Sequence, residues 1–199
     1  AFANNYQRLL YAQAGLQAGE VRGIDSLQAL AGLPAPPRGN NILHLHWINE
    51  VSAGAGDDVD ARGSHFLALL EQRKRDGFAV YWTVHNRLSH DCSQPAAEAA
   101  FRRQLARAVD RVYIHHPMVT SLLDWWPDDV EPWLCEHGPY PAGSRIDRAT
   151  ARQKLQLAPE ERLFLWFGQI RPYKGLDPWL PTILETLAAC RTASLVIAG

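Results

Sequence analysis

Two cations lie three positions apart in a glycine-bounded stretch near the end of the 199-residue chain. The sequence WFGQIRPYKG, residues 166–175, places Arg171 and Lys174 between Gly168 and Gly175. Gly168 permits a tight turn after an apolar strand, and a helix is expected to begin near Gly175. Arginine can bind an anion through two parallel hydrogen bonds, and lysine supplies a compact charge. The pattern therefore predicts a diphosphate pocket at a helix N-terminus, or else a solvated loop whose charges happen to be neighbours.

Histidines are the second group of residues that could bind a ligand or take part in catalysis. Most of the eight histidines follow apolar runs. His44 and His46 share one face of a predicted strand because they are two residues apart. His85 ends the next strand, with Asn86 and Arg87 directly after it. The later members of the group are His115, His116 and His137.

Two interpretations of these histidines follow from their residue type and spacing alone. A zinc site could use His44 and His46 with Asp91, although no HExxH or CxxC motif accompanies them. Alternatively the imidazoles line the core or a cleft and bond to the backbone, which we favour for His44, His115 and His116. The first interpretation would make the protein a metal hydrolase.

The elements that must position these residues alternate along the chain. Strands are predicted at 41–47, 78–86, 111–116, 130–137, 162–168 and 193–199. Helices are predicted at 4–19, 63–77, 95–110, 117–126, 147–157 and 175–191. Such alternation is typical of an α/β fold with parallel sheets covered on both faces. In these sheets ligands bind beyond the carboxyl ends of the strands, where the histidines and the two cations are expected.

Proline and glycine interrupt the pattern at GPYPAGSRID, residues 138–147, which is the best candidate for a linker. We predict an N-terminal Rossmann-like domain over 1–137 and the start of a second such domain over 148–199. Two strands and two helices after the linker are few for a complete domain, and the chain opens on a helix. We therefore expect a longer natural protein, cut at both ends.

Composition limits the remaining possibilities. The formal net charge of −1 does not favour binding of nucleic acid. Three separated cysteines predict neither a disulfide framework nor a zinc site, and favour a reducing cytosol. No apolar run reaches the ~20 residues needed to span a bilayer. Trp125 and Trp126 could contact a membrane surface, but we favour packing in the core or at a domain interface. The basic run at 73–75 could also contact a membrane, and a solvated helix end explains it as well.

The stretch FGQIRPYKG resembles the G-x-[IL]-x-x-x-K-G region of retaining glycosyltransferases of the GT-B fold, specifically glycosyltransferase family 4. The resemblance extends upstream to NNYQRLLY, HLHW, WTVHN and EHGPYP, and so covers most of the chain. It implies that Arg171 and Lys174 bind the phosphates of a nucleotide-sugar donor, with Gly168 at the turn. The glutamate pair that contacts the donor in this family would lie beyond Gly199, and the usual glycine-rich loop near the N-terminus is missing.

The same resemblance implies roles on the acceptor side. His85 would line the catalytic cleft, where its neutral imidazole can bond a sugar hydroxyl without being the general base. His137 and Gly138 would lie close to the donor sugar or act as a hinge. We add Glu50, Asn86 and Arg87 as candidate acceptor-binding residues.

The expected activity is transfer of a hexose from a nucleotide-diphosphate sugar to a saccharide or lipid-linked acceptor, with retention of configuration. No metal or other cofactor is expected. The acceptor would be a precursor of a bacterial polysaccharide or glycolipid, and the protein cytoplasmic or peripheral to the inner membrane. The 199-residue piece by itself is expected to be inactive. The alternative from another class is a module that binds a nucleotide or phosphorylated sugar without turnover.

Overall fold

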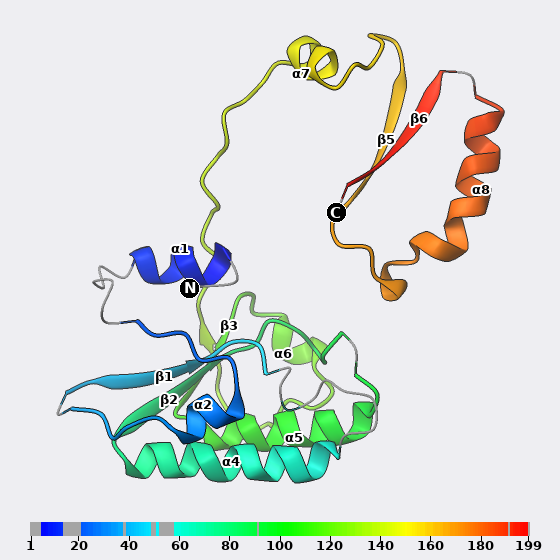
Figure 1. Cartoon of the computed structure of the whole chain (residues 1–199). Coiled ribbons are helices and arrows are strands. Elements are labelled where there is room, and N and C mark those ends of the chain that lie inside the picture. The colour runs from blue at the N-terminus through cyan, green and yellow to red at the C-terminus, as the bar shows by residue number, and fades with distance from the viewer. Residues whose placement is uncertain are drawn as a thin grey trace. The chain divides into compact units, whose positions relative to one another are not determined.

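The computed structural model describes residues 5–13, 21–37, 39–48, 51, 58–90, 92–190 and 192–198. It divides into two compact units, residues 1–140 and 141–199, and each is described by itself (Figure 1). The division falls inside the segment 138–147, and residues 135–147 form neither helix nor strand. Glu50 and Asp91 lie outside the described residues.

Four parallel strands form the sheet described in the first unit, in the order β1-β2-β3-β4. They are β1 (Asn41–Leu45), β2 (Phe78–Thr83), β3 (Arg111–Ile114) and β4 (Trp133–Leu134). The register aligns Leu45 with Trp82, and Thr83 with Tyr113. Because all four strands are parallel, their carboxyl ends lie at one edge of the sheet, and the residues after them meet there.

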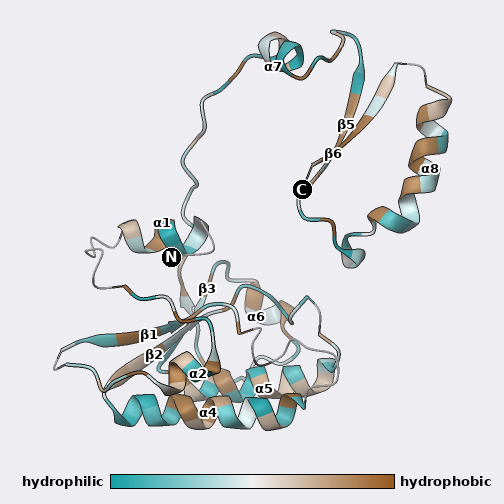
Figure 2. Ribbon diagram, in the orientation of Figure 1, coloured by the Kyte–Doolittle hydropathy of each residue, from teal (hydrophilic) through white to brown (hydrophobic). Residues whose placement is uncertain are grey.

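Two long helices cover one face of this sheet, α4 (Val59–Arg75) and α5 (Pro95–Ala108) (Figure 1). Asp58 caps α4 by accepting from the Ala61 amide, and Pro95 occupies the first turn of α5. Their apolar stripes pack on the buried side of the strands, visible as brown bands in Figure 2. The resulting core includes Leu43, Val80, Trp82, Val112, Phe66, Leu70, Phe101 and Leu105.

Shorter helices that the structure describes in the first unit are α1 (Asn5–Gln13), α2 (Leu27–Ala31) and α6 (Val119–Leu122). The predicted helix 117–126 shrinks to α6 because Trp125 turns inward, where it is 1% exposed and stacks on Trp82 at 5.7 Å. The membrane interpretation of Trp125 is therefore wrong. The basic run 73–75 also has protein partners, since Arg73 donates to the Leu33 carbonyl, Lys74 pairs with Asp110 and Arg75 with Glu71.

The second unit contains α7 (Arg148–Lys154), β5 (Arg162–Phe167), a 3₁₀ turn η1 (Pro172–Lys174), α8 (Leu176–Ala188) and β6 (Ala193–Ala198). Strands β5 and β6 pair in parallel, as expected from the pattern. The continuous apolar pattern of β5 is typical of a strand buried on both faces, but in the described residues most of this strand is exposed. Phe164, Leu165 and Phe167 are 55%, 59% and 79% exposed. The reason is that a two-stranded sheet packed against a single long helix leaves most of its apolar surface uncovered.

The α/β class with parallel sheets is thus confirmed. Within the described residues, no helix combines the length and the apolar character that crossing a bilayer requires.

Candidate functional site

Aromatic rings gather at the carboxyl edge of the first unit's sheet. His46 follows β1, His85 follows β2 and His115 follows β3, so the parallel register brings them together. The ring centroids of His46 and His85 are 5.4 Å apart, and those of His85 and His115 are 5.3 Å apart. His137, after β4, has its ring centroid 5.3 Å from that of His115. These histidines thus lie at the carboxyl ends of the strands, where the sequence pattern places them.

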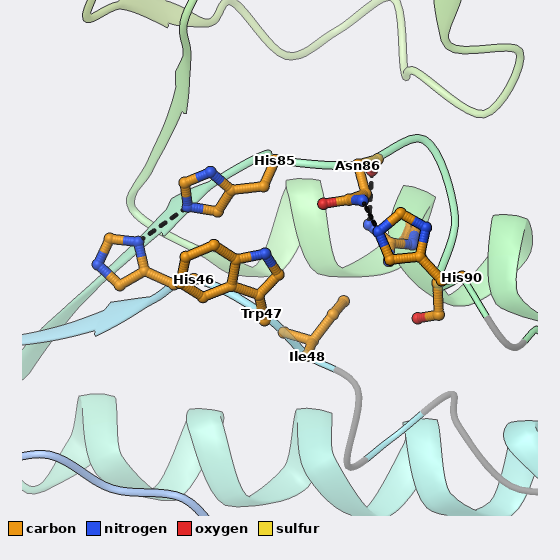
Figure 3. A pocket seen from close by; sticks show the side chains of 8 residues that line it. His46, Trp47, Ile48, His85, Asn86 and His90 are labelled. Carbon is orange, nitrogen blue, oxygen red and sulfur yellow. Dashed lines mark hydrogen bonds between the residues drawn. The ribbon is translucent and has the colours of Figure 1, made fainter. Parts of the chain in front are cut away.

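Hydrogen bonds join several of these rings into a chain that begins inside the sheet. Thr83 Oγ1 lies 2.8 Å from His44 Nε2, and the hydroxyl of Tyr11 lies 2.9 Å from His44 Nδ1. The same hydroxyl is 2.8 Å from His46 Nε2. His46 Nδ1 then lies 3.1 Å from His85 Nε2 (Figure 3). His44 was expected to bond to the backbone; instead both of its nitrogens bond to side chains, because its strand position faces Tyr11 and Thr83.

Burial keeps these histidines neutral. Desolvation lowers the pKa of His44 to about 4, and desolvation together with the neighbouring histidines lowers that of His46 to about 3 and that of His85 to about 4. Desolvation also raises the pKa of the Tyr11 hydroxyl. At neutral pH each of these imidazoles therefore has one donor and one acceptor nitrogen.

Helix α1 contributes two tyrosines to this edge. Tyr6 is 8% exposed, and its ring contacts His85 edge-on with centroids 4.9 Å apart and His137 at the same separation. Burial raises the pKa of Tyr6 to about 12. Trp47 stacks on the His85 ring at 4.3 Å with an angle of 13° between the planes. His85 is thereby held by ring contacts as well as by its bond to His46.

Beside His85 lies a small polar cavity of about 20 Å³, enough for one water molecule. Its lining includes Asn86, whose side-chain amide is 3.0 Å from His90 Nε2 (Figure 3). The other lining residues are His46, Trp47, Ile48, His85, Ser89 and Arg102.

A buried ion pair on α5 fixes the loop that carries these residues. Glu98 is fully buried and accepts from the Ser89 amide and from Arg102 Nε, both at 2.7 Å. Arg102 also donates to the Asn86 carbonyl at 3.1 Å. Burial alone would raise the pKa of Glu98, but the Cys92 thiol, the guanidinium and the amide hold it below its ordinary value.

The remaining candidates of the first unit have structural partners. Arg87 pairs with Asp124 at 2.5 Å on the surface, and its carbonyl accepts from the Trp125 indole. His115 donates from Nδ1 to the Cys135 carbonyl at 2.7 Å, as predicted for a backbone-bonded histidine. His137 donates to the carbonyl of Gly138 at 2.8 Å. A Cβ on residue 138 would meet nothing within 4 Å, so packing does not require a glycine there.

In the second unit, the loop after β5 has the geometry that its glycines predict. Gly168 has a φ of +108°, and Gly175, which precedes α8, has a φ of +74°. The Lys174 amine folds back so far that a Cβ on residue 168 would lie 3.1 Å from Nζ. Arg171 is exposed, and its guanidinium donates to Gln169 Oε1 at the long distance of 3.5 Å. Two cations thus lie beside the start of a long helix, whose first turn also carries Asp177.

A metal centre finds no support in the part of the chain that the structure describes. No group of three or more His, Cys, Asp or Glu side chains there is arranged to hold an ion. His44 and His46, the proposed ligands, already use both ring nitrogens in hydrogen bonds. The metal-hydrolase interpretation rested on these two residues with Asp91.

His85 and Asn86 were predicted at the end of the strand 78–86, but β2 ends at Thr83 and both residues follow it. Gly168 and Arg171 lie in the loop after β5 as predicted, and Lys174 lies in the 3₁₀ turn η1.

Sequence reasoning missed Tyr6, Tyr11, Trp47, Glu98 and Arg102. Only the last two left a signal, because a Glu–Arg pair at i and i+4 on a helix invites a bridge. Nothing local shows that the tyrosines of α1 reach the far-separated strand ends.

Comparison with known proteins agrees with this architecture. No protein-family model matches the chain. The chain is similar to a D-inositol 3-phosphate glycosyltransferase of Nocardioides sp. (strain ATCC BAA-499 / JS614), with 27% identity over 186 residues. The match covers 87% of this chain and 38% of the relative. The chain therefore spans well under half the length of the curated protein it matches.

Proposed function

We propose that this chain belongs to a glycosyltransferase that moves a hexose from a nucleotide-diphosphate sugar to a saccharide or lipid-linked acceptor. The observation that carries the proposal is the loop after β5, where Gly168 brings the Lys174 amine back beside the strand end. The similarity to a glycosyltransferase across 87% of the chain supports it independently.

The proposed catalytic chemistry follows from where negative charge develops during glycosyl transfer. When the glycosyl bond breaks, negative charge grows on the departing diphosphate, and cations already in place stabilise it without reorganisation. Arg171 would bind two phosphate oxygens at once, and Lys174 would supply a point charge. The amides at the start of α8 add partial positive charge.

The acceptor belongs, in this proposal, at the carboxyl edge of the first unit. His85 would bond an acceptor hydroxyl as a neutral imidazole, because its lowered pKa makes it a weak base at pH 7. Asn86, on the loop anchored by Arg102, would add a second polar contact. The neutral character of the edge suits an uncharged polyol better than an anion.

Three finer features are part of the proposal. Transfer proceeds with retention, and it requires no metal; the resemblance of the loop to retaining glycosyltransferases supports both. The protein works in the cytoplasm, where nucleotide sugars are made, at the inner membrane surface if its acceptor is lipid-linked. Chelator-treated enzyme and the anomeric configuration of the product test the first two.

The decisive experiment measures transfer from a panel of radiolabelled nucleotide sugars, using the protein in the full length that its gene encodes. Lys174→Ala is expected to lower turnover at least ~100-fold, the effect of losing one preset charge donor. Lys154→Ala removes an equal charge from the exposed end of α7 and is the matched control. Wild-type rates in the Lys174→Ala variant would contradict the phosphate role. Nucleotide binding without any transfer would make the protein a binding module instead.

A further inference from the structure

Trp47 is a large apolar side chain that the fold leaves partly in water. The period of a strand would send it into the core together with Leu43. However, β1 ends at Leu45, and the Trp47 side chain is 39% exposed, whereas Leu43 is 8% exposed. Single exposed apolar residues are common, so exposure alone does not indicate a function. The contacts around the indole distinguish Trp47 from an ordinary surface residue.

The plane of the indole is held from one side. The Trp47 ring stacks on His85 at 4.3 Å, with 13° between the planes. The Tyr6 centroid is 4.9 Å from that of His85 and 6.3 Å from that of Trp47. The His46 centroid is likewise nearer to His85, at 5.4 Å, than to Trp47, at 5.9 Å. A ring on the far side of the indole would be nearer to Trp47, so within the described residues the second face of the indole has no aromatic partner.

Hydrogen-bonding groups lie beside the indole. The indole nitrogen is at the end of Trp47 that is directed towards Asn86 and His90 in Figure 3. In the part of the chain that the structure describes, neither the indole N–H nor Asn86 Oδ1 has a hydrogen-bond partner. They offer one donor and one acceptor. The cavity of about 20 Å³ that Trp47 and Asn86 line admits one water-sized group, so a larger ligand must lie outside it, against the indole.

A pyranose ring has the surface that these groups require. Its faces present C–H groups, whose partial positive charge is attracted by the negative face of an indole. The hydroxyls at its rim both donate and accept hydrogen bonds. A lipid acyl chain would also cover the indole, but it would leave the indole N–H and Asn86 Oδ1 without partners. His46 and His85 are neutral at pH 7, so they offer no charge to an anionic ligand.

We propose that Trp47 is the stacking platform of the acceptor site and that the group bound there is an uncharged pyranose ring. One C–H face of the ring lies on the open face of the indole, and its hydroxyls bond the indole N–H and Asn86 Oδ1. Trp47 thereby selects a ring over an acyclic polyol with similar hydroxyls. The identification of this ring as the acceptor rests on the proposed function, whereas the stacking site rests on the geometry of the first unit.

Titration of the full-length protein, labelled with ¹⁵N in its tryptophan indoles, tests the stacking site. The probes are the methyl glycosides of glucose, galactose and mannose, and sorbitol is the acyclic control. The Trp47 signal is the one that Trp47→Phe lacks. We expect at least one glycoside to shift this signal and to have its own C–H resonances moved upfield by the ring current, whereas sorbitol does neither. A Trp47 signal that no glycoside shifts would overturn the proposal, as would an equal response to sorbitol.

Variants separate the aromatic face from the packing around it. Trp47→Phe keeps a ring against His85 and is expected to bind the glycoside within about threefold of wild type, whereas Trp47→Leu should weaken binding about tenfold. Trp133→Leu is the matched control, because Trp133 is 52% exposed but Arg111 already covers its ring at 4.1 Å. The side-chain amide of Asn86 reports binding in every variant. Equal affinities of Trp47→Leu and wild type would refute the stacking; should Trp47→Leu not fold, the ring-current shifts in the wild type decide.

Transfer assays on the full-length protein distinguish this inference from the proposed function. With a glycoside that accepts sugar, Trp47→Leu should raise the KM for the glycoside about tenfold and leave the KM for the nucleotide sugar unchanged. If the wild type binds a glycoside at Trp47 but transfers no sugar, the proposed function fails and the stacking site stands. If sugar is transferred to a glycoside while neither the Trp47 signal nor the KM of Trp47→Leu changes, the stacking inference is wrong and the proposed function stands.

Discussion

Single residues in the loop after β5 show how a backbone conformation can create a charged pocket. Gly168 at a φ of +108° occupies a region that residues with a side chain rarely adopt. The same absence of a Cβ leaves room for the Lys174 amine against the backbone. The glycine therefore serves both the turn and the placement of the cation.

Gly168→Ala tests both functions. The strained φ is expected to cost on the order of 1–3 kcal/mol of stability in the second unit. The added methyl group would also displace the amine, weakening nucleotide diphosphate binding. Urea-dependent hydrogen exchange of the β5 amides measures the first effect, and calorimetric titration with UDP and GDP the second. Gly143→Ala, where a Cβ meets nothing within 4 Å, is the control, and equal behaviour of the two variants would contradict the argument.

Elements position the loop of the first unit through a buried charge pair. Helix α5 presents Glu98 and Arg102 at i and i+4, and together they bond the Ser89 amide and the Asn86 carbonyl. Helix α5 can pack close to α4 because residue 63 of α4 is a glycine. A Cβ at Gly63 would lie 2.8 Å from the Phe101 ring. The position of the 84–90 loop thus depends on how tightly two helices pack.

Arg102→Met should destabilise the first unit strongly, by about 3–5 kcal/mol, because it leaves the Glu98 carboxylate buried without a counter-charge. Arg107→Met, on the same helix, breaks an exposed bidentate pair with Asp129 and should change stability far less. Denaturant unfolding followed by circular dichroism compares the two. Similar losses in both variants would show that the buried pair has no special role.

At the scale of the whole molecule, the cluster of neutral histidines makes the free energy of unfolding depend on pH. The folded state lowers the pKa values of His44, His46 and His85 below the ordinary 6.5, so it favours their neutral forms. Stability is therefore full above pH 6.5 and falls as the pH drops towards the folded values of about 4 and 3. Among the described residues, the other titratable groups whose rings contact these three histidines are Tyr6, Tyr11, Tyr113 and His115.

We expect the thermal midpoint of unfolding of the first unit to decrease as the pH is lowered from 7 to 5. A single histidine that stays neutral when folded, such as His46, accounts for up to about 2 kcal/mol at pH 5. His46→Gln should flatten the pH dependence, whereas His65→Gln, on the exposed side of α4, should preserve it. A stability that does not change over this range would mean that the cluster is protonated or solvated at pH 5.

The sequence by itself determined the alternation of helices and strands, the parallel arrangement, the turn at Gly168 and the start of a helix near Gly175. These follow from local patterns, since the period of apolar residues and the position of glycines act within a few residues of the chain. It also determined that His46, His85 and His115 would share one edge, because parallel strands all end on the same side.

Only the tertiary structure decided which partners those side chains have. Tyr11 lies 33 residues before His44 and 35 before His46, and no local pattern encodes that contact. The same holds for the exposure of β5, which reads as a buried strand but lacks covering layers in the described residues. Hydrogen-bond partners and burial depend on atoms from distant segments, so they are properties of the folded chain and not of its sequence pattern.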